Sequence, residues 1–162
     1  MRLIMTAVGR RLPDWVSQGV ATYAGRFGGG VTLELTEVEA PRRGRNVDIA
    51  GIVRTEGKLL LQAVPRGSHL VALDERGTQH DSDSAAARLE AWMADGRDVA
   101  LLIGGADGLA GEVFDAAQEC WSLSALTLAH PLVRVVLAEQ LYRAYSILRG
   151  LPYHRGARMF GP

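Results

Sequence analysis

The sequence predicts an α/β fold: a three-layer sandwich in which helices cover both faces of a mostly parallel sheet. Short apolar runs alternate along the chain with stretches of helical periodicity, which is the pattern of parallel sheets. The run at 99–103 is apolar throughout, as expected of a central strand that is covered on both faces. The 162 residues are about one domain's worth of chain, and no repeat or linker divides them. We therefore expect a single domain over residues 1–162.

The first half of the chain is predicted to alternate strands and helices. Residues 2–8 are apolar and are followed by Gly9, which indicates a buried strand. After Pro13, apolar residues recur every three to four positions up to the glycines at 28–30, which indicates a helix. Residues 31–36 alternate between apolar and polar, which is the period of a strand with one buried face. A second helix is expected at 48–63.

The second half continues the same alternation. A strand at 70–73 is expected to end in a turn at 74–77, and Ser82 or Ser84 is expected to cap a helix that stops at Gly96. The remaining elements are predicted as the central strand at 99–103, a glycine-rich loop at 104–108, a short helix at 111–119, a strand from Trp121 that leads into an apolar loop ending at Leu128, and a long helix at 131–148.

The last residues of the chain, 150–162, are predicted to form an irregular tail. Gly150 and Pro152 end the last helix, so we expect the tail to contribute to a functional site and to add little to the core. The role of the extension at 156–162 stays open.

Composition narrows the class of function. Eighteen basic residues balance eighteen acidic ones, which argues against a protein that binds nucleic acid through bulk charge. The charges are unevenly distributed: residues 74–119 hold eleven acids and three arginines, whereas residues 129–162 hold five arginines and one acid. The single cysteine, Cys120, forms no internal disulfide, and no metal-ligand spacing occurs. With no membrane-spanning run and no secretion signal, we expect a cytoplasmic protein without a metal or a membrane partner.

Ligands of open α/β sheets bind beyond the carboxyl ends of the strands, which nominates three loops. They are the end of the third strand at Leu73, the glycine-rich loop at 104–108 and the loop at 123–128. The glycine loop does not fit dinucleotide-binding or P-loop patterns and could be a plain turn. The small hydroxylated residues at 123–128 suit a loop that encloses an adenine base, although a plain edge strand is the alternative.

His130 stands directly before Pro131, at the amino end of the long helix. There the helix dipole disfavours an imidazolium and favours a neutral base or a contact with an anion. A purely structural histidine is the alternative.

Four segments of the chain are distinctive: MRLIMTAVGRRLPDWV, LLIGGADG, WSLSALTLAHPLVRVVLAEQLYRAYSI and PYHR. Together they resemble the RlmH family of SPOUT-type ribosomal RNA methyltransferases, and the similarity runs from residue 1 to about residue 155. The resemblance implies a C-terminal trefoil knot, a homodimer and S-adenosylmethionine as methyl donor. It also implies methylation of N3 of a pseudouridine in a stem-loop of 23S ribosomal RNA, on the assembled ribosome.

The resemblance also assigns site residues. It places the cofactor pocket on Leu73, Gly104, Leu123, Ser124, Ala125, Leu126, Thr127 and Leu128, which are the loops that the sheet rule nominates. It implies that the tail motif Tyr153, His154 and Arg155 helps to form the active site, reaching across the dimer. His130 and His154 are candidate bases for the imide proton of N3, and Arg155 is a candidate stabiliser of the anion. Contact with RNA phosphates is the alternative role for all three.

RNA binding requires cations on the surface. Arg42, Arg43, Arg45 and Arg143 lie outside the acidic middle of the chain and are expected to contact phosphates. Few aromatic residues accompany them, which suits a folded RNA recognised by its shape. Zero net charge predicts modest affinity for isolated RNA, as expected of an enzyme whose substrate is the ribosome. A SPOUT methyltransferase acting on another RNA, such as transfer RNA, and a non-catalytic nucleotide-binding or ribosome-associated module are the alternative functions.

Overall fold

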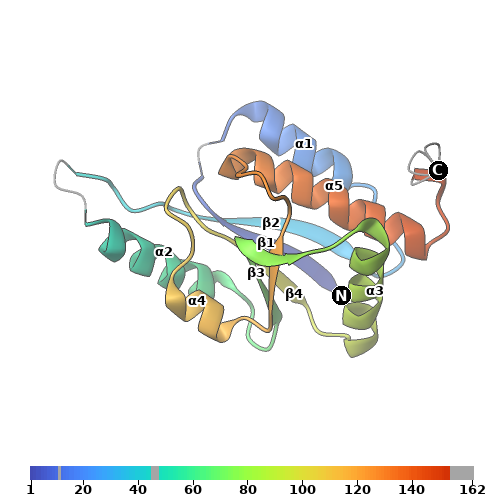
Figure 1. Ribbon diagram of the computed structural model, residues 1–162. Coiled ribbons are helices and arrows are strands. Elements are labelled where there is room, and N and C mark those ends of the chain that lie inside the picture. Colours follow the sequence, from blue (N-terminus) through green and yellow to red (C-terminus); the bar gives the residue numbers. More distant parts are fainter. Residues whose placement is uncertain (11, 45–47, 154–162) are drawn as a thin grey trace.

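Five parallel strands form the middle layer of the structure, in the order β2-β1-β4-β3-β5 (Figure 1). They are β1 (Arg2–Val8), β2 (Thr32–Val38), β3 (His69–Gln79), β4 (Val99–Ile103) and β5 (Glu119–Ser122). The computed structural model describes residues 1–10, 12–44 and 48–153, and within it every pairing between neighbouring strands of the sheet is parallel. The predicted α/β class is confirmed. The knot expected near the C-terminal end stays a prediction.

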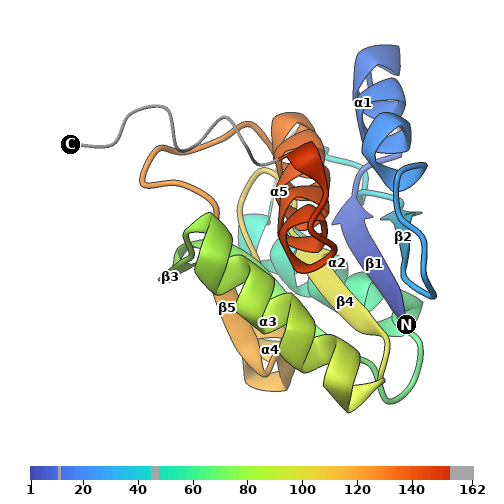
Figure 2. The ribbon, with the colours of Figure 1, turned by 90° about the vertical axis from the view of Figure 1, so that its right-hand side faces the viewer.

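Helices cover both faces of the sheet. The first face carries α1 (Asp14–Ala24), α3 (Ser82–Asp95) and α5 (His130–Leu148), and α5 lies between the other two (Figure 2). The second face carries α2 (Ile49–Ala63) and the short α4 (Gly111–Ala116) (Figure 1). No helix in the described part of the chain is both long and apolar enough to cross a bilayer.

The central strand β4 shows how the sequence builds this core. Val99, Leu101 and Ile103 pack on the face of α1, α3 and α5, whereas Ala100 and Leu102 pack on the face of α2 and α4. All five are at most 3% exposed, because neighbouring side chains of a strand point to opposite faces and both faces are covered. The uninterrupted apolar run is thereby explained.

The third strand is longer than the sequence predicts. The expected turn at 74–77 does not end β3: the strand pairs with β5 up to Leu73 and pairs with it again from Thr78. Asp74 accepts a hydrogen bond from the backbone N–H of Arg76 (3.0 Å), so the local turn chemistry is present. A Cβ on Gly77 would lie 2.6 Å from the carbonyl carbon of Trp121. Residues 74–77 therefore form a bulge in β3 that packs against β5, and the pairing of the two strands continues after it.

Smaller differences concern the ends of elements. β5 begins at Glu119 and stops at Ser122, instead of starting at Trp121, and α4 ends at Ala116 instead of 119. Beyond Ser122 the chain no longer pairs as a strand. There the Ser124 hydroxyl accepts a hydrogen bond from the backbone N–H of Leu126 (2.9 Å), a local bond of the kind that competes with strand pairing.

Two helices also begin at other residues than expected. The cap of α3 is the carboxylate of Asp81, which accepts from the backbone N–H of Ser84 (2.7 Å) in place of a serine hydroxyl. The long helix α5 begins at His130, one residue before Pro131.

Candidate functional site

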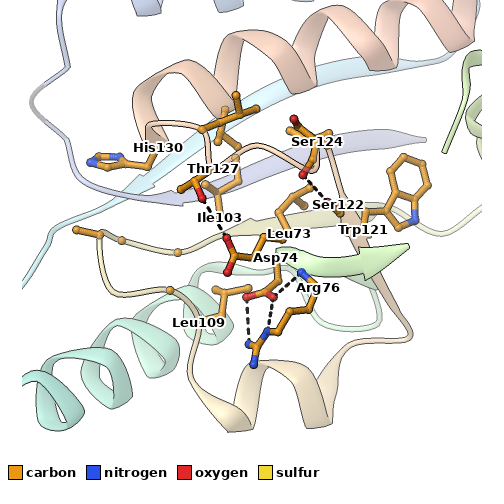
Figure 3. Close-up of a pocket in the computed structure, with 18 of the residues that line it drawn as sticks. Leu73, Asp74, Arg76, Ile103, Leu109, Trp121, Ser122, Ser124, Thr127 and His130 are labelled. Carbon is orange, nitrogen blue, oxygen red and sulfur yellow. Dashed lines mark hydrogen bonds and ion pairs between the residues drawn. The ribbon is translucent and has the colours of Figure 1, made fainter. Parts of the chain in front are cut away.

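A pocket of about 520 Å³ opens at the carboxyl ends of β4 and β5, beside residues 73–76 in the middle of β3 (Figure 3). The three loops that the sheet rule nominated converge there, joined by the first turn of α5. Seven of the eight predicted cofactor-binding residues line it; they are Leu73, Gly104, Leu123, Ser124, Leu126, Thr127 and Leu128. Ala125 belongs to the same loop but is not among the lining residues. The volume lies in the usual range of small-molecule sites.

The glycine-rich loop after β4 makes a tight return. The N–H of Gly108 bonds to the carbonyl of Gly105 (3.3 Å), and Gly108 has a φ of +86°. A Cβ on Gly104 would lie 2.6 Å from the carbonyl oxygen of Gly108. A side chain at residue 104 would therefore displace the loop itself before it filled the pocket.

Acidic side chains in the pocket wall were not predicted. Asp74 accepts from Arg76 Nε (2.7 Å), and this hydrogen bond lowers the pKa of Asp74 below its ordinary value. Glu75 accepts from the hydroxyl of Thr127 (3.3 Å) and so connects β3 to the 123–129 loop (Figure 3). Both acids belong to the bulge at residues 74–77 of β3. The sequence of this bulge is that of an ordinary surface turn.

His130, the predicted base, lines the pocket at the start of α5. Burial and the neighbouring Arg134 lower its pKa below the ordinary histidine value, so the ring is neutral at pH 7. Its Nδ1 is buried and has no hydrogen-bond partner among the described residues. The guanidinium of Arg134 is fully buried and donates to the carbonyls of Val8 (2.6 Å) and Gly9 (2.9 Å). His130 therefore has the protonation state that a base requires.

Tyr153 does not line this pocket but packs against α5 of its own chain. Its hydroxyl donates to Glu139 Oε1 (2.9 Å), and its ring packs edge-on against Tyr142 with 4.9 Å between centroids. Both Leu151 and Tyr153 pack against the core, so the expectation that the tail adds little to the core is wrong for these residues. His154 and Arg155, the other predicted residues of the tail, lie outside the described residues.

The predicted RNA-binding arginines differ in how accessible they are. Arg42 is exposed, and the exposed Arg43 forms an ion pair with Asp107 of the glycine loop. Arg143 is half-buried, donates to Glu139 (2.5 Å) and lies 5.0 Å from the ring centre of Tyr153, so its charge is compensated within the fold. Arg45 lies outside the described residues. Across the described chain, no group of three or more His, Cys, Asp or Glu side chains could hold a metal ion.

Comparison with known proteins adds two findings. A family model described as a predicted SPOUT methyltransferase matches residues 1–154. Among solved structures, the chain is similar to a probable methylase family protein from Haemophilus influenzae Rd KW20, with a TM-score of 0.50 and 14% sequence identity. The similarity covers 92% of this chain and 67% of the other, and at this identity it shows the fold alone.

Proposed function

Because the chain belongs to the SPOUT methyltransferase family, whose members use S-adenosylmethionine, we propose that the pocket beside β3 and at the ends of β4 and β5 binds this cofactor. We also propose that the protein methylates N3 of a pseudouridine in 23S ribosomal RNA on assembled ribosomes. The observation that carries the cofactor site is the convergence of Leu73, Gly104 and the 123–128 loop on one pocket. The substrate rests on the resemblance to the RlmH family. This substrate would place the activity in the cytoplasm.

The residues of the pocket suit the proposed cofactor. Apolar side chains of Leu73, Ile103 and Leu128 offer surface to an adenine ring, and the loop at 123–128 offers hydroxyls and backbone groups to its edge. Acidic side chains in the wall suit a ligand that carries positive charge. When bound, the cofactor supplies an electrophilic methyl group on its sulfonium.

The contribution of the protein would be to position the acceptor and to remove a proton. Methyl transfer requires a free lone pair held about 3 to 3.5 Å from the methyl carbon, and N3 of pseudouridine carries a proton near neutral pH. The neutral ring of His130 lines the wall of the pocket. We propose that this ring accepts the imide proton. Groups of the tail would stabilise the resulting anion, and Arg155 is the candidate among them.

A homodimer completes the proposal, with the tail reaching the partner's pocket. Exposed apolar side chains of Trp15 and Leu132, on the first turns of α1 and α5, support a buried interface. Ultracentrifugation at micromolar protein should give twice the 17.5 kDa mass of the chain, and a species of 17.5 kDa alone would contradict the dimer.

The decisive experiment combines calorimetry with mass spectrometry. Titration with S-adenosylmethionine should show binding, and 23S ribosomal RNA from a strain that lacks the gene should lose one methyl group on a pseudouridine. Restoring the gene with His130→Ala should leave cofactor binding nearly unchanged and slow methylation about 10²- to 10⁴-fold. Loss of a methyl group from transfer RNA instead would support another RNA substrate. Cofactor binding with no change in any RNA would support a non-catalytic module.

A further inference from the structure

Glu56 is an acidic side chain in the interior of the protein. It belongs to the middle of α2, on the side that faces the sheet, and it is 3% exposed. Its Oε2 has no hydrogen-bond partner among the described residues. Buried carboxylates without full compensation are rare because burial disfavours the charge, and they concentrate at functional sites.

The carboxyl group of Glu56 lies directly against the glycine-rich loop of the pocket. A Cβ built on Gly105 would lie 2.6 Å from Glu56 Oε2 and 2.8 Å from Oε1. The carboxyl group thus occupies the space that any side chain at residue 105 would need. The next residue of α2 makes a similar approach, since a Cβ on Gly57 would lie 2.6 Å from that of Ala110. The helix α2 therefore closely approaches both Gly105 of the loop and Ala110, the residue before α4.

Burial and three neighbouring groups determine the charge state of Glu56. Burial raises its pKa above the ordinary value for glutamate, and the nearby Asp107 raises it further. Arg43 and the backbone N–H of Gly105 act in the opposite direction, because each stabilises the carboxylate. Arg43 also forms the ion pair with Asp107, so the charged groups that face Glu56 belong to the same loop or contact it.

We propose that Glu56 is a positioning residue of the cofactor pocket, and that its carboxylate holds the backbone at Gly105 in the conformation that accepts S-adenosylmethionine. Glu56 is not among the lining residues, whereas Gly104 and Gly105 are, so it acts through them. The inference rests on the proposed function, in which this loop binds the cofactor.

The test measures the dissociation constant of S-adenosylmethionine by calorimetry for wild type, Glu56→Gln, Glu56→Ala and Gly105→Ala. Glu56→Ala should weaken binding about tenfold, the size expected for one charge-assisted contact. Glu56→Gln keeps the shape and an acceptor for Gly105, so its loss should be smaller. Wild-type affinity should decrease as the pH falls through the titration of Glu56, and Glu56→Gln should not show this change. Glu112→Gln, at an exposed acid of α4, is the matched control and should match wild type.

A coupling measurement distinguishes positioning from general damage to the fold. Gly105→Ala should weaken binding, because its methyl group would meet the carboxylate, and adding Glu56→Ala should cost less than the sum of the two single effects. If wild type binds the cofactor while Glu56→Gln and Glu56→Ala keep its affinity and pH profile, the positioning role is wrong and the proposed function stands. If wild type does not bind the cofactor, both proposals are wrong.

Discussion

Glu119 is largely buried and Glu56 is buried, on opposite faces of the sheet, and the two carboxylates differ in their hydrogen-bond donors. The carboxylate of Glu119 accepts from His69 Nε2 (2.7 Å), Trp92 Nε1 (2.9 Å), Trp121 Nε1 (2.9 Å) and the guanidinium of Arg88. Glu56 has an oxygen with no such donor in the described chain. Burial disfavours ionisation of both, but the four donors outweigh it at Glu119 and lower its pKa to about 2, whereas the pKa of Glu56 is raised.

This difference distinguishes Glu119, whose hydrogen bonds stabilise the fold, from Glu56, whose burial serves the pocket. Glu119 connects β5 to β3 through His69 and to α3 through Arg88 and Trp92, elements that are distant in the sequence. Its bond from Trp121 stays within β5. Glu56 lies instead behind a loop of the pocket, where the cost of its burial is not offset by equivalent bonds. Compensated burial of a carboxylate stabilises a fold, whereas incomplete compensation is typical of sites.

The largest effect is expected for Glu119→Gln. An amide in place of the carboxylate leaves Arg88 without its counter-charge and one indole or imidazole donor without an acceptor. Removing one partner of such a network costs about 3 kcal/mol of the free energy of unfolding, measured by urea denaturation. A loss below about 0.5 kcal/mol would show that the network adds little to stability.

The same variant should also change the response to acid. Because folding lowers the pKa of Glu119 from 4.5 to about 2, its contribution is complete above about pH 4.5 and decreases as the pH falls toward 2. The stability difference between wild type and Glu119→Gln should therefore shrink over this range. A difference that stays constant down to about pH 2 would contradict the assignment.

Tyr153→Phe should change the free energy of unfolding by an amount between those of the two glutamate variants. Glu139 accepts from Gln140 Nε2 (2.5 Å), Arg143 (2.5 Å) and the Tyr153 hydroxyl (2.9 Å), so losing one of three donors should cost about 1 kcal/mol in the same assay. Truncation after Leu151 should cost more, because the ring contact with Tyr142 is lost as well. Unchanged stability after truncation would show that these contacts do not stabilise the fold.

The smallest effect on stability is expected for Glu56→Gln. This change removes a desolvated charge, and no described side-chain donor loses its acceptor. The free energy of unfolding at neutral pH should therefore rise by less than about 1 kcal/mol. Because the folded pKa is raised, the wild type should gain on the variant at low pH and lose this advantage as the pH rises through the pKa of Glu56. A loss as large as that of Glu119→Gln would place a strong partner beside Glu56.

The strands and the pocket loops differ in how far the sequence predicts them. β1 and β4 are found where expected, because an apolar run of this short length that ends at a glycine is typical of a buried strand. The course of residues 74–79 could not be foreseen. Asp-Glu-Arg-Gly is ordinary turn chemistry, and the resumption of β3 depends on pairing with β5, which local spacing does not encode.

In the pocket, the rule for strand ends located the three loops but stopped at Leu73, so Asp74 and Glu75 were missed. A signal for Glu56 was present in the sequence. It lies on the apolar stripe of α2, between Val53 and Leu60, where an acid is unexpected. Its contact with Gly105 is tertiary, and no local pattern reveals it.

The position of β4 in the sheet also bears on how the chain is synthesised. β4 separates β1 from β3, and it pairs Leu3 with Val99 and His69 with Val99. Until residues 99–103 leave the ribosome, the edges of β1 and β3 that β4 will cover have no strand beside them. At about 5 to 20 residues per second, this delay for β1 is roughly 5 to 20 seconds. The nascent apolar strand β1 is therefore open to pairing with other chains on this edge until β4 is made.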